Sequence, residues 1–159
     1  MSTQQRLVRE TDEEARGLAQ HLLRNARFGA LGVLDPAGGA PMVSRVSVGT
    51  DADGTPVSLM SDLSLHTQAI AGNPACSLLV GEPGPRGDPL IHPRLTLQCT
   101  AARADKAALK PLYLSQHPKA ALYFDFSDFS VYRLVVTEAH LNGGFGKAFH
   151  LMPEDLRLT

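Results

Sequence analysis

The polar side chains best suited to bind a ligand lie close together in one short segment that begins at Ser61. The segment holds three hydroxyls and one imidazole: Ser61, Ser64, Thr67 and His66. It follows the apolar run 56–60 and is expected to open a short helix. A helix N-terminus offers unpaired N–H groups and the positive end of the helix dipole, so these side chains could bind an anion such as a phosphate. The simpler alternative, in which a serine caps the helix and the other residues are solvated, stays open.

Composition limits what kind of protein can hold this segment. The chain has 159 residues, 43% hydrophobic and 19% charged, as expected for one globular domain with a real core. A formal net charge of −1 and the lack of a Lys/Arg-rich run predict no nucleic-acid partner and no membrane association. The first residues lack the apolar stretch of a secretory signal, and no apolar run is long enough to span a bilayer. We therefore expect a cytoplasmic protein.

Cysteines and histidines give no sign of a metal centre. Cys76 and Cys99 lie in apolar, strand-like runs, which predicts buried free thiols. The six histidines show no metal-ligand spacing such as H-E-x-x-H, so no metal site is predicted. His150 is expected on an exposed C-terminal tail.

Local sequence patterns outside this segment predict the helices and strands that surround it. Thr11 and Glu14 form a capping-box pattern before an amphipathic helix over about 12–26. Six strands are expected, separated by turns rich in Gly, Pro and Asp: 28–34, 42–48, 57–60, 75–80, 94–101 and 129–139. Helices are expected after the third and fifth strands, and a short helical piece after Pro118.

This order predicts a mainly β (α+β) fold, a split β-barrel of about six antiparallel strands, because short strands joined by tight turns close their edges in a barrel. One domain covers residues 1–159. It would consist of an N-terminal helix (1–26), the barrel (27–143) and a C-terminal tail (144–159).

Five segments, in this order and spacing, carry a resemblance that runs from about residue 27 to residue 156. They are Gly39–Val46, Ser61–Pro74, Arg94–Leu97, Asp128–Leu134 and Gly144–Ala148. On these segments the chain resembles the pyridoxamine 5′-phosphate oxidase-like, FMN-binding split-barrel superfamily, and within it the haem-utilisation subgroup. The resemblance implies FMN in a groove between two chains, and hence a homodimer that acts on a small-molecule substrate.

Carried over by position, the resemblance implies a cofactor site. Together with Ser64 at the helix N-terminus, the expected cofactor-binding residues are Ser44, Arg45, Val46, Ser47, Met60, Ser61, His66, Thr67 and Arg94. The planar fork of Arg45 suits a phosphate, and His66 could add charge when protonated. Leu65 and His66 stand where the oxidases carry an Arg-Lys pair, which argues against pyridoxamine phosphate as the substrate.

Three functions follow from the sequence. The first is an FMN-dependent oxidoreductase in which the flavin does the electron chemistry, with no catalytic residue identified. The alternative is a haem-binding or haem-degrading protein, in which Asp128 matches an acidic residue of the subgroup. His140 and His150 would be substitutes for an axial ligand, because neither lies at the subgroup's ligand position. A third possibility is a dimeric scaffold without a cofactor.

Overall fold

This computed structural model describes residues 8–157 of the chain. They contain nine strands and three α-helices, joined by turns and loops. The strands are β1 (Val8–Arg9), β2 (Phe28–Leu34), β3 (Pro41–Ser47), β4 (Gly49–Thr50), β5 (Pro56–Ser61), β6 (Ala75–Val80), β7 (Arg94–Arg103), β8 (Phe129–Asn142) and β9 (Ala148–Leu151). The helices are α1 (Glu13–Asn25), α2 (Leu65–Gly72) and α3 (Lys106–Gln116), with 3₁₀ turns η2 (Pro89–Ile91), η3 (Pro118–Leu122) and η4 (Pro153–Leu156).

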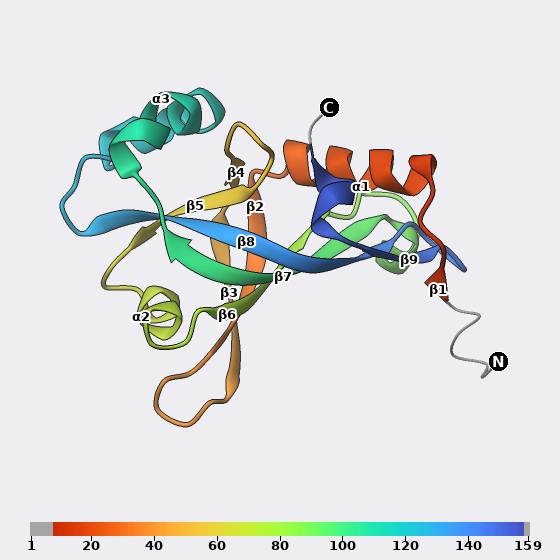
Figure 1. The fold of residues 1–159 in the computed structure, drawn as a ribbon, viewed down its shortest axis with the longest axis horizontal. Helices are drawn as coiled ribbons and strands as arrows, with labels where there is room; N and C mark the ends of the chain where they lie inside the picture. The colour runs from red at the N-terminus through yellow and green to blue at the C-terminus, as the bar shows by residue number, and fades with distance from the viewer. Residues whose placement is uncertain (1–7, 158–159) are drawn as a thin grey trace.

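The strands form one sheet that closes on itself (Figure 1). Its order is β1-β9-β8-β7-β6-β2-β3, and β5 pairs with β8. The chain passes from β3 directly into β4, which pairs with β5 and so completes the ring. Every pairing is antiparallel except that of β1 with β9. The mixed, mainly antiparallel barrel confirms the predicted fold class.

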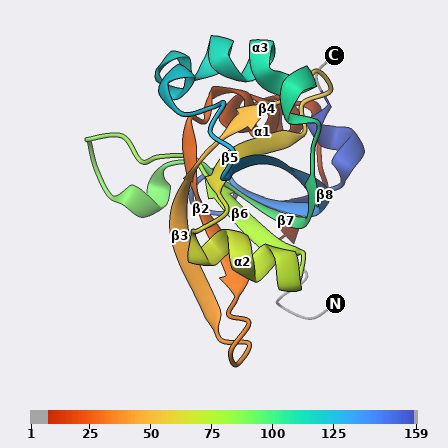
Figure 2. The same cartoon turned by 90° about the vertical axis from the view of Figure 1, so that its left-hand side faces the viewer.

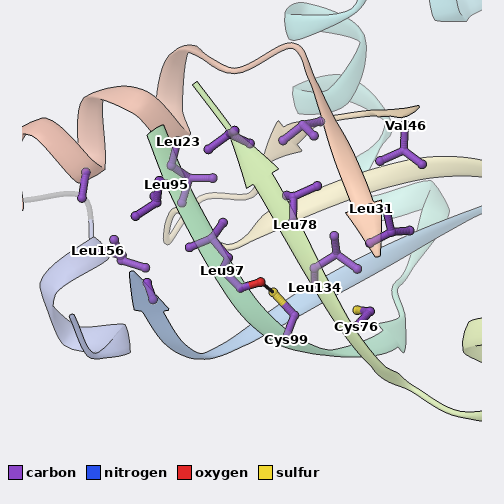
Figure 3. Close-up of a cluster of buried hydrophobic side chains, with 14 of the residues drawn as sticks. Leu23, Leu31, Val46, Cys76, Leu78, Leu95, Leu97, Cys99, Leu134 and Leu156 are labelled. Carbon is purple, nitrogen blue, oxygen red and sulfur yellow. Dashed lines mark hydrogen bonds between the residues drawn. The ribbon is translucent and has the colours of Figure 1, made fainter. Parts of the chain in front are cut away.

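The barrel interior is filled by aliphatic side chains from alternate strand positions (Figure 3). Leu31, Leu78, Leu97 and Leu134, one each from β2, β6, β7 and β8, are fully buried. Alternation along each strand places these side chains on the inner face and their sequence neighbours on the outer face. Both predicted free thiols, Cys76 and Cys99, are buried, as expected.

The helices close the open ends and sides of the barrel. Helix α1 covers one side with Ala15, Ala19 and Leu23, and in Figure 2 α2 lies across the end of the barrel that faces the viewer. A second apolar cluster joins α3 and η3 to β5 and β8 through Tyr113 and Phe124. None of the helices within residues 8–157 is long and apolar enough to cross a membrane.

Several local expectations need correction. The strand count is nine and not about six, because β1, β4 and β9 have only two to four residues each. The cap of α1 is Asp12, whose carboxylate accepts the N–H of Ala15, and not Thr11. The Thr11 hydroxyl instead donates to the carbonyl of His150 at 2.6 Å. His150 belongs to β9 and pairs with His140 of β8, so it lies at the exposed surface of the sheet and not on a free tail. The helices after the third and fifth predicted strands are confirmed as α2 and α3.

Candidate functional site

Strand β3 divides the predicted cofactor residues between two faces of the sheet. Ser44 pairs with the fully buried Leu31 of β2, so its side chain lies on the inner face. Its neighbour Arg45 pairs with Ala30 and lies on the outer face, with its guanidinium 5.3 Å from the centre of the Phe28 ring. Side chains of adjacent strand residues point in opposite directions. Within one chain, Arg45 and Ser44 therefore face different surroundings.

The inner-face group assembles around the N-terminus of α2. The Ser44 hydroxyl lies 3.1 Å from Nδ1 of His66, and Ser64 is the N-cap without a side-chain capping bond. Thr67 is 3% exposed, and its hydroxyl has no hydrogen-bond partner. The Ser61 hydroxyl accepts the N–H of Leu63 at 3.2 Å. Of these groups, the structure brings the Ser44 hydroxyl and the His66 imidazole into contact, whereas the hydroxyls of Ser61, Ser64 and Thr67 share only the same short segment of chain.

This group offers dipoles and hydrogen-bond donors but little positive charge. Burial lowers the pKa of His66 below its usual value, because desolvation disfavours the imidazolium. The imidazole is therefore neutral at pH 7, and helix α2 contains no lysine or arginine. An anion bound here would depend on the helix N-terminus and the hydroxyls.

The outer face is an open surface with Arg45 at one side; it is apolar around Arg45 and carries polar side chains such as Gln98 and His140 farther along β7 and β8. The strand registers place Arg45, Ala30, Leu79, Thr96, His140 and His150 opposite one another in one row across six strands. Three large apolar side chains on this face are solvent-accessible: Phe28 is 41% exposed, Leu79 42% and Val43 69%. We call this surface, from β3 to β9, the outer face.

Two grooves run along the outer face and share Val43. One, of about 510 Å³, passes over Gly32, Ser77, Gln98 and Thr137. The other, of about 420 Å³, lies between Phe28, Arg45 and Leu79. The smaller groove, with its apolar walls and single arginine, suits a flat, mainly apolar ligand that carries an acidic group, whereas the larger groove is floored mostly by polar side chains.

The remaining predicted residues lie apart from both groups. Val46 and Met60 are buried in the core. The Ser47 hydroxyl lies 2.5 Å from the Tyr113 hydroxyl of α3. Arg94 donates to the carbonyls of Leu90 and His92, so its guanidinium is committed to the loop before β7.

A series of hydrogen bonds near the start of α2 was missed by the sequence analysis. Arg103 donates to the Ser130 hydroxyl at 2.6 Å, and Ser130 donates to the carboxylate of Asp62 at 2.8 Å. The backbone N–H of Asp62 in turn donates to the carbonyl of Asp128. These residues come from β7, β8 and the turn after β5, so no local pattern joins them. The sequence signals are Asp128, which the resemblance had already singled out, and Asp62, which stands next to Ser61.

Comparison with known proteins places this geometry in a family. A family model described as "CREG, beta-barrel" matches residues 10–156. The non-canonical heme oxygenase HOZ, chloroplastic, of Arabidopsis thaliana is 37% identical over 116 residues, which cover 70% of this chain and 34% of that protein. This chain thus spans about a third of the length of that relative.

Solved structures agree with this placement. A heme binding protein from Mycobacterium smegmatis is 30% identical with a TM-score of 0.83, over 92% of this chain and 61% of that one. A protein of the pyridoxinephosphate oxidase family from Clostridium acetobutylicum is 14% identical with a TM-score of 0.69, over 92% of this chain and 99% of that one. At that identity the second likeness shows the fold alone.

Proposed function

The chain belongs to the CREG-like β-barrel family of the FMN-binding split-barrel superfamily, and from this premise we propose that it binds haem on its outer face. The observation that carries the proposal is the open apolar surface beside Arg45. Two relatives of at least 30% identity support it, since both are named for haem. FMN, the first expectation from the sequence, becomes the second candidate.

The outer face has the two properties that haem requires of a binding surface. Phe28, Val43 and Leu79 supply apolar contact for a flat macrocycle, and burying exposed apolar area of this kind favours association. Haem also carries two propionates, and Arg45 can bind a carboxylate with its planar fork. None of the residues that line the two grooves is a histidine, so we propose no axial ligand from them.

When bound, haem would supply iron redox chemistry, and the protein would control access and polarity around it. The residues described above would hold the macrocycle and its acidic groups. Breakdown of haem, which the name of the Arabidopsis relative states for that protein, stays a prediction for this chain.

The FMN alternative depends on the inner-face group. The unpartnered Thr67 hydroxyl and the Ser44–His66 pair are polar groups that a phosphate could satisfy. However, a phosphate dianion is best held by charged donors. The lowered pKa of His66 favours its neutral form, and Arg45 lies on the other face of the sheet. The inner-face group therefore lacks the cations that a phosphate needs, and it fits FMN poorly.

A homodimer remains our proposal as well. The exposed apolar side chains of the outer face would be covered by a second copy, and a cofactor in the grooves would then lie between the two chains. The cytoplasmic location and a small-molecule substrate stay predictions.

One absorption titration tests the cofactor. Haemin and FMN are titrated separately into the purified protein, and the Soret band and flavin fluorescence are followed. We expect a Soret shift that saturates at one haem per chain or per pair of chains, and an Arg45→Ala variant should weaken haem binding by about one to two decades. The matched control is Arg24→Ala, an exposed arginine at the end of α1.

Two outcomes would redirect the proposal. Saturable FMN binding that is weakened by Ser44→Ala but not by Arg45→Ala, with no haem binding, would replace haem with FMN and move the site to the inner face. If neither ligand binds, the scaffold alternative stands.

A further inference from the structure

Strand pairing gathers a carboxylate and two imidazoles at the end of the outer face opposite Arg45, where Glu138 lies beside the edge of the larger groove. His140 of β8 and His150 of β9 are direct cross-strand partners, and Glu138 lies two residues before His140 on the same face. One ligand atom from each of the three side chains lies within 4.8 Å of the other two. We propose that Glu138, His140 and His150 form a binding site for a divalent transition-metal ion of the zinc class.

The donor set fits such an ion. Two imidazole nitrogens and one carboxylate oxygen are ligands of Zn²⁺, Cu²⁺ and Ni²⁺, whereas Mg²⁺ prefers oxygen alone. In a tetrahedral zinc site with metal–ligand bonds of about 2.0–2.1 Å, neighbouring ligand atoms lie roughly 3.3 Å apart. The widest separation would need to close by up to about 1.5 Å, and the His150–Glu138 pair, at 2.7 Å, would need to open slightly. Side-chain rotations of exposed residues can provide both changes.

An ion pair alone does not account for the whole arrangement. His150 Nε2 and a Glu138 carboxylate oxygen are 2.7 Å apart, with side chains 42% and 40% exposed. His140 adds nothing to that pair, yet its ring centre lies 5.1 Å from that of His150, at an interplanar angle of 35°. A metal ion would use all three side chains.

The surroundings leave the site accessible and hold its frame in place. The Thr11 hydroxyl donates to the His150 carbonyl at 2.6 Å and ties β9 to the start of α1. Arg94, the cation on the adjoining strand, donates to loop carbonyls and does not compete for the carboxylate. A groove of about 270 Å³ adjoins His140, so a water or a small anion could reach a fourth coordination position.

The test uses the full chain without a histidine tag, freed of metal by a chelator and titrated with ZnCl₂ in a calorimeter. We expect one Zn²⁺ per chain. Because loss of a group that merely orients a ligand already costs about tenfold in metal affinity, His140→Ala and His150→Ala should each weaken binding by at least that factor. Glu138→Gln, which keeps the shape of the side chain, should weaken it as well. The matched control, His21→Ala on exposed helix α1, should bind as the wild type does.

A second measurement removes any dependence on how the variants fold. In wild-type protein, Zn²⁺ should shift the ring resonances of His140 and His150 in NMR spectra and leave those of His21 unchanged, and Mg²⁺ should shift none of them. Absence of Zn²⁺ binding, or equal binding by a folded His140→Ala/His150→Ala double variant, overturns the proposal. Neither result bears on the contribution of Arg45 to haem binding, since Arg45 lies five strands away from His150.

Discussion

Tyr113 joins helix α3 to the strands that carry the candidate site, and we expect Tyr113→Phe to destabilise the protein measurably. The side chain is 2% exposed. Its hydroxyl accepts the backbone N–H of Leu59 at 3.3 Å and lies 2.5 Å from the Ser47 hydroxyl. An oxygen that accepts from Leu59 keeps its own proton for Ser47, so one group satisfies two partners.

The expected decrease in the free energy of unfolding follows from the hydrogen bonds that Leu59 and Ser47 would lose. The N–H of Leu59 is buried and would keep no acceptor, which costs about 1–3 kcal/mol. Ser47 is only half-buried and can turn to water, so its loss adds little. Phenylalanine keeps the stacking of the ring on His117, at a centroid distance of 4.8 Å. We expect a loss of about 2 kcal/mol, or about 4–8 °C in Tm for a chain of this size.

Urea unfolding followed by circular dichroism measures this loss, and Tyr123→Phe is the matched control because Tyr123 is 37% exposed. A double-mutant cycle with Ser47→Ala should return a coupling of about 0.5–1.5 kcal/mol for the hydroxyl pair. If Tyr113→Phe unfolds at the same urea concentration as the wild type, the hydroxyl has no structural role and the reasoning is refuted.

Three further predictions follow from buried groups. Gly29→Ala should lower Tm by several degrees, because the new Cβ would lie 2.8 Å from the backbone carbonyl of Leu79; an unchanged melting curve would show that β6 yields without cost. An NMR titration should give His66 a pKa below about 6.5, since burial disfavours its charged form. Because the unfolded state then binds more protons, His66 stabilises the fold above its unfolded pKa and that contribution is lost as pH falls below it; a raised pKa would contradict this. Cys76, whose pKa burial raises to about 11, and the more buried Cys99 should not react with a thiol reagent at pH 8 until the protein unfolds, and fast labelling of the native protein would refute this.

The barrel was predictable because its signals are local. Alternating apolar residues and Gly- or Pro-rich turns mark each long strand, and the two inserted helices follow from the change in period. Strands of two residues, such as β1 and β4, carry no pattern of their own and exist because a neighbouring strand offers them hydrogen bonds. The N-cap of α1 is Asp12 and not the predicted Thr11 for a similar reason, because the Thr11 hydroxyl donates to a backbone carbonyl 139 positions further along the chain.

The candidate site was less predictable, for two different reasons. The separation of Ser44 from Arg45 could have been read from the sequence, because alternation in a strand places neighbours on opposite faces. The meeting of Glu138, His140 and His150 could not, because metal motifs are recognised by fixed local spacing and this cluster depends on the register between β8 and β9.

The long strand β8 has a consequence for the order in which the nascent chain can fold. It pairs with β5, β7 and β9, and Ser61 of β5 finds its partner in Phe129, 68 positions further along the chain. At about 5–20 residues per second, a ribosome needs several seconds to synthesise that interval. During this time β5 presents an unpaired apolar edge, with Val57 and Leu59 exposed to other chains. We expect the ring to close only near the end of translation, so slowing synthesis between residues 62 and 128 should increase aggregation of the newly made protein.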